Sequence, residues 1–89
     1  MARLDIQQAD MAILGGQAAT ADILFQMGLD SASGRYGATD LVSAHKWFNI
    51  AALKGNREAV LHRKEISGEM SREDIAEAQR CAREWLSAH

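Results

Sequence analysis

Apolar side chains recur at every third or fourth position through most of this chain, the spacing of one face of an α-helix. Glycines and short polar runs separate the periodic stretches, and no proline is present to interrupt a helix. The pattern therefore predicts an all-α fold of four to five helices. The predicted helices span residues 18–32, 40–54, 57–68 and 72–87, with a short further helix within 3–14 that ends at Gly15-Gly16.

The helix predicted at 40–54 is the one around which we expect the others to pack. On a helical wheel at about 100° per residue, aromatic and small residues gather on one side. The small residues let a neighbouring backbone come close, and the rings fill the space beside it. Thr39 or Asp40 can cap the start of this helix, and Gly55 can end it. The one-sided set is Leu41, Ala44, Trp47, Phe48, Ala51 and Ala52.

The helix predicted at 18–32 has a narrow polar strip, formed by Asp22, Gln26 and Asp30. Apolar residues, among them Ile23, occupy the remaining arc, roughly 240° of the circumference by the helical-wheel rule. A helix that packs on a single partner needs a stripe of only about 100°. We therefore expect cover on two sides, in part from the N-terminal segment and in part from a second copy of the chain, and we predict a homodimer or a larger assembly.

Three further features complete the pattern. Val42, Ile50 and Leu53 lie away from the main stripe of 40–54 and predict a second contact surface. The 57–68 segment is strongly charged, with a thin buried edge. Ser71 begins a capping box before the amphipathic helix at 72–87.

We expect residues 1–16 to form an N-terminal arm, either a short helix or a segment that orders only against a neighbour, and residues 17–89 to form one domain.

Composition narrows the functional classes. Apolar residues make up 47% and charged residues 25% of the 89 residues, as in ordinary globular proteins, and the formal net charge is −2. That charge gives no reason to expect nucleic acid or anionic lipid as a partner. The single cysteine cannot form an internal disulfide, and the N-terminal stretch lacks the apolar run of a signal peptide or a membrane span. We expect a cytoplasmic protein with no membrane partner.

The candidates for chemistry are few. His45, His62 and His89 fall on different elements, and no spacing of histidine, cysteine and acidic residues fits a metal site. We expect His45 at the boundary of its helix and His62 in surface pairing with Glu58 or Glu65. Cys81 lies at the edge of an apolar stripe with no local histidine to activate it. The sequence therefore predicts no catalytic residue, no cofactor and no metal.

The segment from Phe25 to Ala59 resembles one Sel-one-like repeat, a helix-turn-helix relative of the tetratricopeptide repeat. Its departures from the family pattern are Ser31, where the pattern has tyrosine, and the loop residues Tyr36 and Gly37. The resemblance implies an α-solenoid type of fold, with the later helices closing the stack. The matching positions are Met27-Gly28, Gly34, Asp40, Ala44, Trp47-Phe48, Ala51-Ala52, Gly55 and Ala59.

The resemblance also implies a non-catalytic scaffold or adaptor for protein–protein contact. Because a lone repeat cannot bury its own faces, self-association is part of this expectation. The residues expected to bind protein are Asp22, Ile23, Gln26, Asp30, Val42, Ile50 and Leu53. The alternative is a helix-turn-helix nucleic-acid-binding regulator, against which stand the net charge of −2 and the absence of a basic recognition helix.

Overall fold

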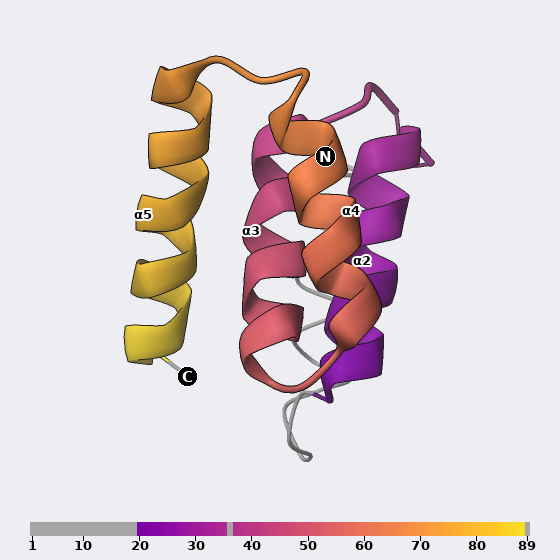
Figure 1. Cartoon of the computed structure of the whole chain (residues 1–89), viewed down its shortest axis with the longest axis vertical. Coiled ribbons are helices and arrows are strands. Elements are labelled where there is room, and N and C mark those ends of the chain that lie inside the picture. Colours follow the sequence, from indigo (N-terminus) through magenta and orange to yellow (C-terminus); the bar gives the residue numbers. More distant parts are fainter. Residues whose placement is uncertain (1–19, 36, 89) are drawn as a thin grey trace.

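The computed structural model describes residues 20–35 and 37–88, and all of their regular secondary structure is helical (Figure 1). This confirms the all-α prediction. The predicted arm at 1–16, with the helix expected within 3–14, lies outside the described residues. The helices are α2 (Ala21–Ser33), α3 (Leu41–Leu53), α4 (Arg57–Ser67) and α5 (Arg72–Ala88).

A polar side chain caps the start of every one of these helices. The first helix begins later than the predicted residue 18 because Thr20 is extended and accepts the first capping bond. Each such cap typically contributes about 1 kcal/mol. The caps are Thr20 Oγ1 with the N–H of Ile23 (3.2 Å), Asp40 Oδ1 with Ser43 (3.0 Å), Asn56 Oδ1 with Ala59 (2.9 Å) and Ser71 Oγ with Asp74 (3.0 Å).

Two glycines in the left-handed region follow helix ends. Gly34, at φ 74°, follows α2, and the N–H of Arg35 then donates to the carbonyl of Asp30 at 3.1 Å. Gly55, at φ 109°, lies one residue beyond the C-cap of α3. These φ values favour glycine, which has no Cβ to clash. Both turns therefore follow from the glycine positions in the sequence.

The central element is α3, which packs against α2, α4 and α5 (Figure 1). Asn56, the N-cap of α4 just beyond the end of α3, donates a hydrogen bond to Asp22 at the start of α2. The end of α3 therefore lies beside the start of α2, and these two helices are antiparallel. The large side chains of the predicted stripe lie in the core, with Phe48 fully buried and Trp47 2% exposed. The prediction that the other helices pack around 40–54 is confirmed.

Aromatic rings join three of the helices. The ring of Phe25 on α2 lies 5.7 Å from that of Phe48 on α3, centroid to centroid. His62 on α4 lies 5.1 Å from Phe25 and 5.4 Å from Phe48. Aromatic pairs at these separations contribute about 0.5–1.5 kcal/mol beyond the area they bury. The cluster of Phe25, Phe48 and His62 therefore fixes where α4 lies on the α2–α3 pair.

The last helix packs on α3 through its apolar stripe. Ala78 and Ala82 are buried, and the ring of Trp85 lies edge-on to that of Trp47 at 5.7 Å. The outer residues of α5 are polar and exposed, as the amphipathic pattern predicts. Among the described residues, no helix is long and apolar enough to cross a membrane.

Candidate interaction surface

The predicted polar strip of α2 lies on the surface, but its side chains already make hydrogen bonds and an ion pair within the chain. Asp22 and Gln26 are exposed, whereas Asp30 keeps only 16% of its side chain exposed. Asp22 Oδ1 accepts a hydrogen bond from Asn56 Nδ2 at 3.1 Å. Asp30 Oδ1 accepts from Gln26 Nε2 at 3.0 Å and pairs with Arg35 Nη1 at 3.4 Å. The strip therefore forms polar contacts near both ends of α2, and it also presents polar groups to solvent.

The apolar arc of α2 is covered more completely than its pattern suggested. Leu24 is fully buried, and Met27 is 8% exposed. Ile23, Phe25 and Leu29 are half-buried against the core. None of the large, strongly exposed apolar side chains of the described residues belongs to α2.

The second predicted contact surface is wrong at one of its three positions. Ile50 is fully buried in the core, because α3 is packed by helices on three sides and needs more than one apolar stripe. Val42 is half-buried, and Leu53 is 67% exposed at the end of α3. The set does not form one continuous exposed patch.

The most exposed large apolar side chain among the described residues is one that the pattern did not single out. Leu61 on α4 is 68% exposed. It lines an open hollow of about 320 Å³ together with Glu58, His62 and Glu65. The exposure of Leu61 could have been inferred from the sequence. Ala59 and Ile66 form the buried edge of α4, and Leu61 lies on a different side of the helix. We call this feature the Leu61 hollow.

The basic run His62-Arg63-Lys64 does not form one patch. His62 is half-buried in the ring cluster, and no ion pair with Glu58 or Glu65 is formed in the described part of the chain, contrary to the expected surface pairing. Arg63 Nη1 donates to Asn49 Oδ1 on α3 at 2.9 Å. Only the lysine is fully on the surface. Because the three side chains face different ways, the run lacks the shared face that phosphate contacts need.

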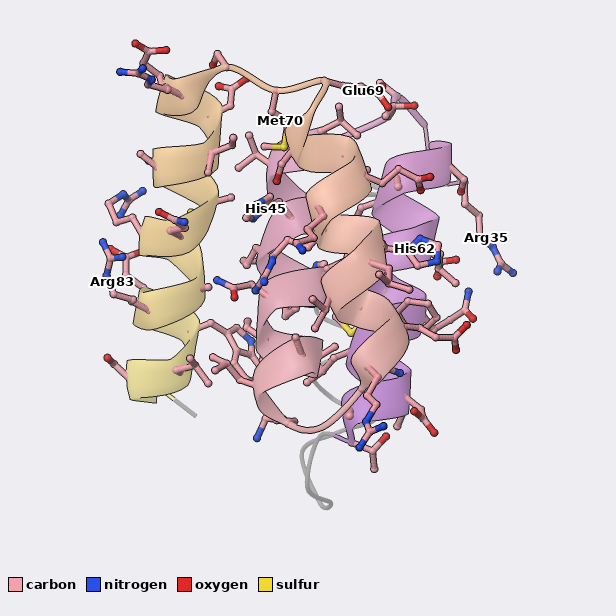
Figure 2. All side chains as sticks on the ribbon, viewed as in Figure 1. Arg35, His45, His62, Glu69, Met70 and Arg83 are labelled. Carbon is pink, nitrogen blue, oxygen red and sulfur yellow. The ribbon has the colours of Figure 1, made fainter. Side chains whose placement is uncertain are left out.

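His45 lies deeper than the boundary position expected for it. It is 2% exposed, and its Nε2 lies 3.1 Å from Ser67 Oγ on α4 (Figure 2 labels His45). Ser67 donates its only hydroxyl proton to the Arg63 carbonyl at 2.7 Å, so its oxygen must accept from His45 Nε2–H. Nδ1 is buried without a hydrogen-bond partner. The neutral ring therefore acts as a structural link between α3 and α4.

The same surroundings oppose a charge on that ring. Burial, followed by the nearby Arg63 guanidinium, lowers the pKa of His45 below 6.5. A protonated ring would place an additional N–H where the buried Nδ1 has no acceptor. His45 is thus held neutral at physiological pH and is packed away from solvent.

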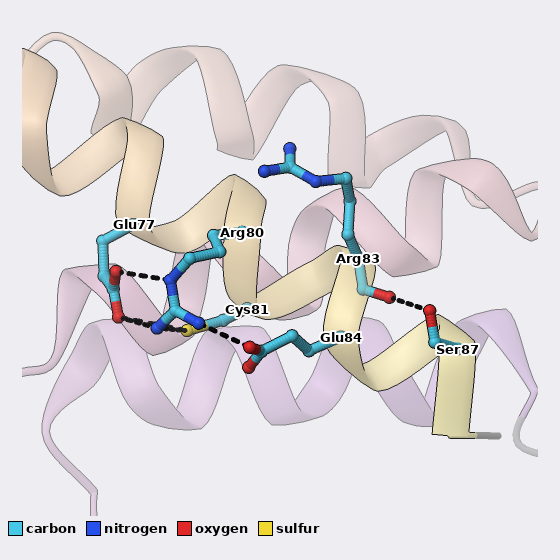
Figure 3. Close-up of polar contacts among 6 residues, drawn as sticks. All are labelled: Glu77, Arg80, Cys81, Arg83, Glu84 and Ser87. Carbon is cyan, nitrogen blue, oxygen red and sulfur yellow. Dashed lines mark hydrogen bonds and ion pairs between the residues drawn. The ribbon is translucent and has the colours of Figure 1, made fainter.

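Cys81 is half-buried and surrounded by a network of exposed charges on α5 (Figure 3). Arg80 Nε donates to Glu77 Oε1 at 2.9 Å, and Arg80 Nη1 pairs with Glu84 Oε2 at 2.6 Å. Burial, and then the hydrogen bond to the Glu77 carboxylate, raises the pKa of the Cys81 thiol. A raised pKa leaves little thiolate at neutral pH, so the thiol is poorly suited to act as a nucleophile.

Within residues 20–35 and 37–88, no group of three or more histidine, cysteine or acidic side chains is placed to hold a metal ion.

Comparisons of the chain with protein families, with curated proteins and with solved structures returned no match.

Proposed function

We propose that this protein is a non-catalytic protein–protein interaction scaffold of the Sel-one-like repeat type. The observation that carries the proposal is the outer face of α4, where Leu61 is 68% exposed within a hollow framed by charged side chains. The exposed leucine offers apolar surface for a partner protein to bury. His45 is buried in the core, and the pKa of the Cys81 thiol is raised, so neither group is poised to react, which supports a role without catalysis.

The local geometry of the motif residues supports the repeat assignment. Gly28 provides a close helix approach, Gly34 ends α2 and Asp40 begins α3. These are the tasks that a helix-turn-helix repeat needs at such positions. Under this proposal the α2–α3 hairpin is the repeat, and α4 and α5 close the stack on either side of α3.

Self-association is a second part of the proposal. It is supported by Ile23, Phe25 and Leu29, which keep part of their surface accessible and would bury it against a second copy. Sedimentation at about 100 μM tests this part, because a specific homodimer usually binds more tightly than that. A dimer is the expected species, and a well-folded monomer at that concentration contradicts self-association alone.

The scaffold proposal is tested by capture with the tagged chain in lysate from its source cells. The wild type is compared with Asp22→Lys plus Gln26→Lys on α2 and with Leu61→Ser on α4, each checked for helical content by circular dichroism. We expect a defined set of proteins that at least one variant loses. If the folded wild type retains nothing above an untagged control, the scaffold proposal fails.

A further inference from the structure

The outer face of α4 combines one exposed leucine with two free carboxylates. Glu58 and Glu65 lie three and four residues from Leu61, one helical turn to either side of it. Both glutamates are exposed, and neither has an ion-pair partner in the described ranges. Their charges therefore remain available to a molecule that covers the leucine.

The Leu61 hollow has a firm inner wall. His62 lines it, and the ring of His62 is held between Phe25 and Phe48 at centroid distances of 5.1 and 5.4 Å. In Figure 2, His62 lies on the side of α4 that faces α2. The surface is thus built on a helix whose position is set by packing, which reduces the ordering cost of binding.

The charges in the hollow identify the chemistry of an occupant. A carboxylate at each end attracts lysine or arginine, and the leucine between them offers an apolar contact. Arg57 and Lys64 flank Leu61 on its other side, each one helical turn away, and do not line the hollow. The charged side chains that line the hollow itself are therefore both carboxylates, and these favour a basic occupant on that side of Leu61.

We propose that the Leu61 hollow docks a basic amphipathic helix of a partner protein. Residues 58 and 65 are two turns apart, about 10.5 Å along the axis. A partner helix with lysine or arginine at i and i+7 and leucine at i+4 matches both carboxylates and the central leucine. This inference rests on the proposed scaffold function and names the class of partner that the scaffold receives.

A charge-swap experiment tests the assignment. The probes are two fluorescent helical peptides, one with lysine at i and i+7 and leucine at i+4, and one with glutamate in place of both lysines. Their binding is followed by fluorescence anisotropy at about 50 mM and 150 mM salt, since exposed charge pairs weaken as salt rises. The proteins are the wild type, Leu61→Ser, and Glu58→Lys combined with Glu65→Lys. The matched control is Glu73→Lys with Asp74→Lys, an equal charge change at exposed positions of α5.

We expect the wild type to bind the lysine peptide and to prefer it over the glutamate peptide at least tenfold. Leu61→Ser and the α4 double variant should each weaken binding of the lysine peptide at least tenfold, and the α4 double variant should reverse the preference. The α5 control should stay within about twofold of the wild type.

Equal binding of the two peptides, or an α5 effect as large as the α4 effect, overturns the proposal. A dimer that Leu61→Ser abolishes would assign the hollow to a second copy and overturn it as well. If capture from lysate succeeds and is unchanged by Leu61→Ser and by the α4 double variant, the scaffold function stands and the α4 assignment fails. Absence of any captured protein is instead the failure of the scaffold function.

Discussion

Gly28 lies so close to Phe48 that no other residue fits at position 28 without movement. A β-carbon on residue 28 would stand 2.5 Å from Cδ1 and Cε1 of the Phe48 ring. The ring is fully buried and cannot swing out to solvent. The absence of a side chain on α2 therefore sets how near α2 approaches α3.

Replacing Gly28 by alanine should lower the free energy of unfolding by up to about 2 kcal/mol. Overpacking costs about 1–3 kcal/mol, and the better helix propensity of alanine returns about 1 kcal/mol. Urea unfolding followed by circular dichroism measures the change. Gly68→Ala is the control, because a β-carbon there meets only an ordinary contact, 3.5 Å from the Glu65 carbonyl oxygen. If the two variants are equally stable, the close approach is not as tight as described.

Protonation of His45 should destabilise the fold. Because burial and Arg63 lower the folded-state pKa below 6.5, the unfolded chain binds the proton more readily than the folded chain. The stabilising contribution is complete above about pH 6.5 and is lost as pH falls through the lower folded pKa. We expect the free energy of unfolding to fall between pH 7 and pH 5, with a slope of at most about 1.4 kcal/mol per pH unit from this residue.

His45→Gln is the comparison for that pH series, since an amide can still donate to Ser67 but does not titrate. Every other ionisable group is the same in both proteins, so the difference between the two pH profiles isolates His45. Parallel profiles would show that the ring is not held neutral by its surroundings.

Removing the Ser67 hydroxyl, which accepts from the His45 ring, should also lower the free energy of unfolding. Ser67→Ala leaves the buried His45 Nε2–H without its 3.1 Å partner, which typically costs about 1–3 kcal/mol. Ser87 provides a matched control, because its hydroxyl makes the same bond to a carbonyl four residues earlier, that of Arg83, at an exposed site (Figure 3). Ser87→Ala should change stability by less than about 0.5 kcal/mol. Equal effects in calorimetry would rule out a special role for the α3–α4 link.

Trp85→Ala should loosen α5 more than the rest of the protein. Its ring contacts Trp47 edge-on across the α5–α3 interface, and we expect a loss of about 2–3 kcal/mol, below the 3–5 kcal/mol of fully buried rings. Hydrogen exchange should speed up over residues 72–88 and change little in α2. Leu86→Ala, at a position 38% exposed, should have a smaller effect. Uniform acceleration over all helices would indicate that α5 does not open separately.

The helices could be predicted because their signals are local. Asp40 and Ser71 cap helices where the pattern placed them, and Gly55 follows the end of α3 as predicted. The candidate surface could not be predicted in the same way. Ile50 is in the core, because burial of α3 depends on three neighbouring helices that one helical wheel does not include.

Leu61 shows the converse case: Ile50 was expected on the surface and is buried, whereas the exposure of Leu61 was not predicted. Its surroundings of Arg57, Glu58, Lys64 and Glu65 indicated a solvated helix, and the leucine itself carried no separate weight. Which side of α4 remains open depends on how His62 packs into Phe25 and Phe48. That arrangement joins residues far apart in the sequence, so periodicity within α4 places Leu61 off the buried edge but does not reveal the hollow beside it.

The account centres on the Leu61 hollow as the contact surface, and a ¹⁵N chemical-shift titration tests it most directly. The isotopically labelled chain is titrated with the lysine peptide at about 50 mM salt. We expect the largest amide shifts at residues 58–65, smaller ones near Phe25, and none of comparable size on the outer face of α5. Shifts that concentrate on α5 or spread evenly over all four helices would contradict the account.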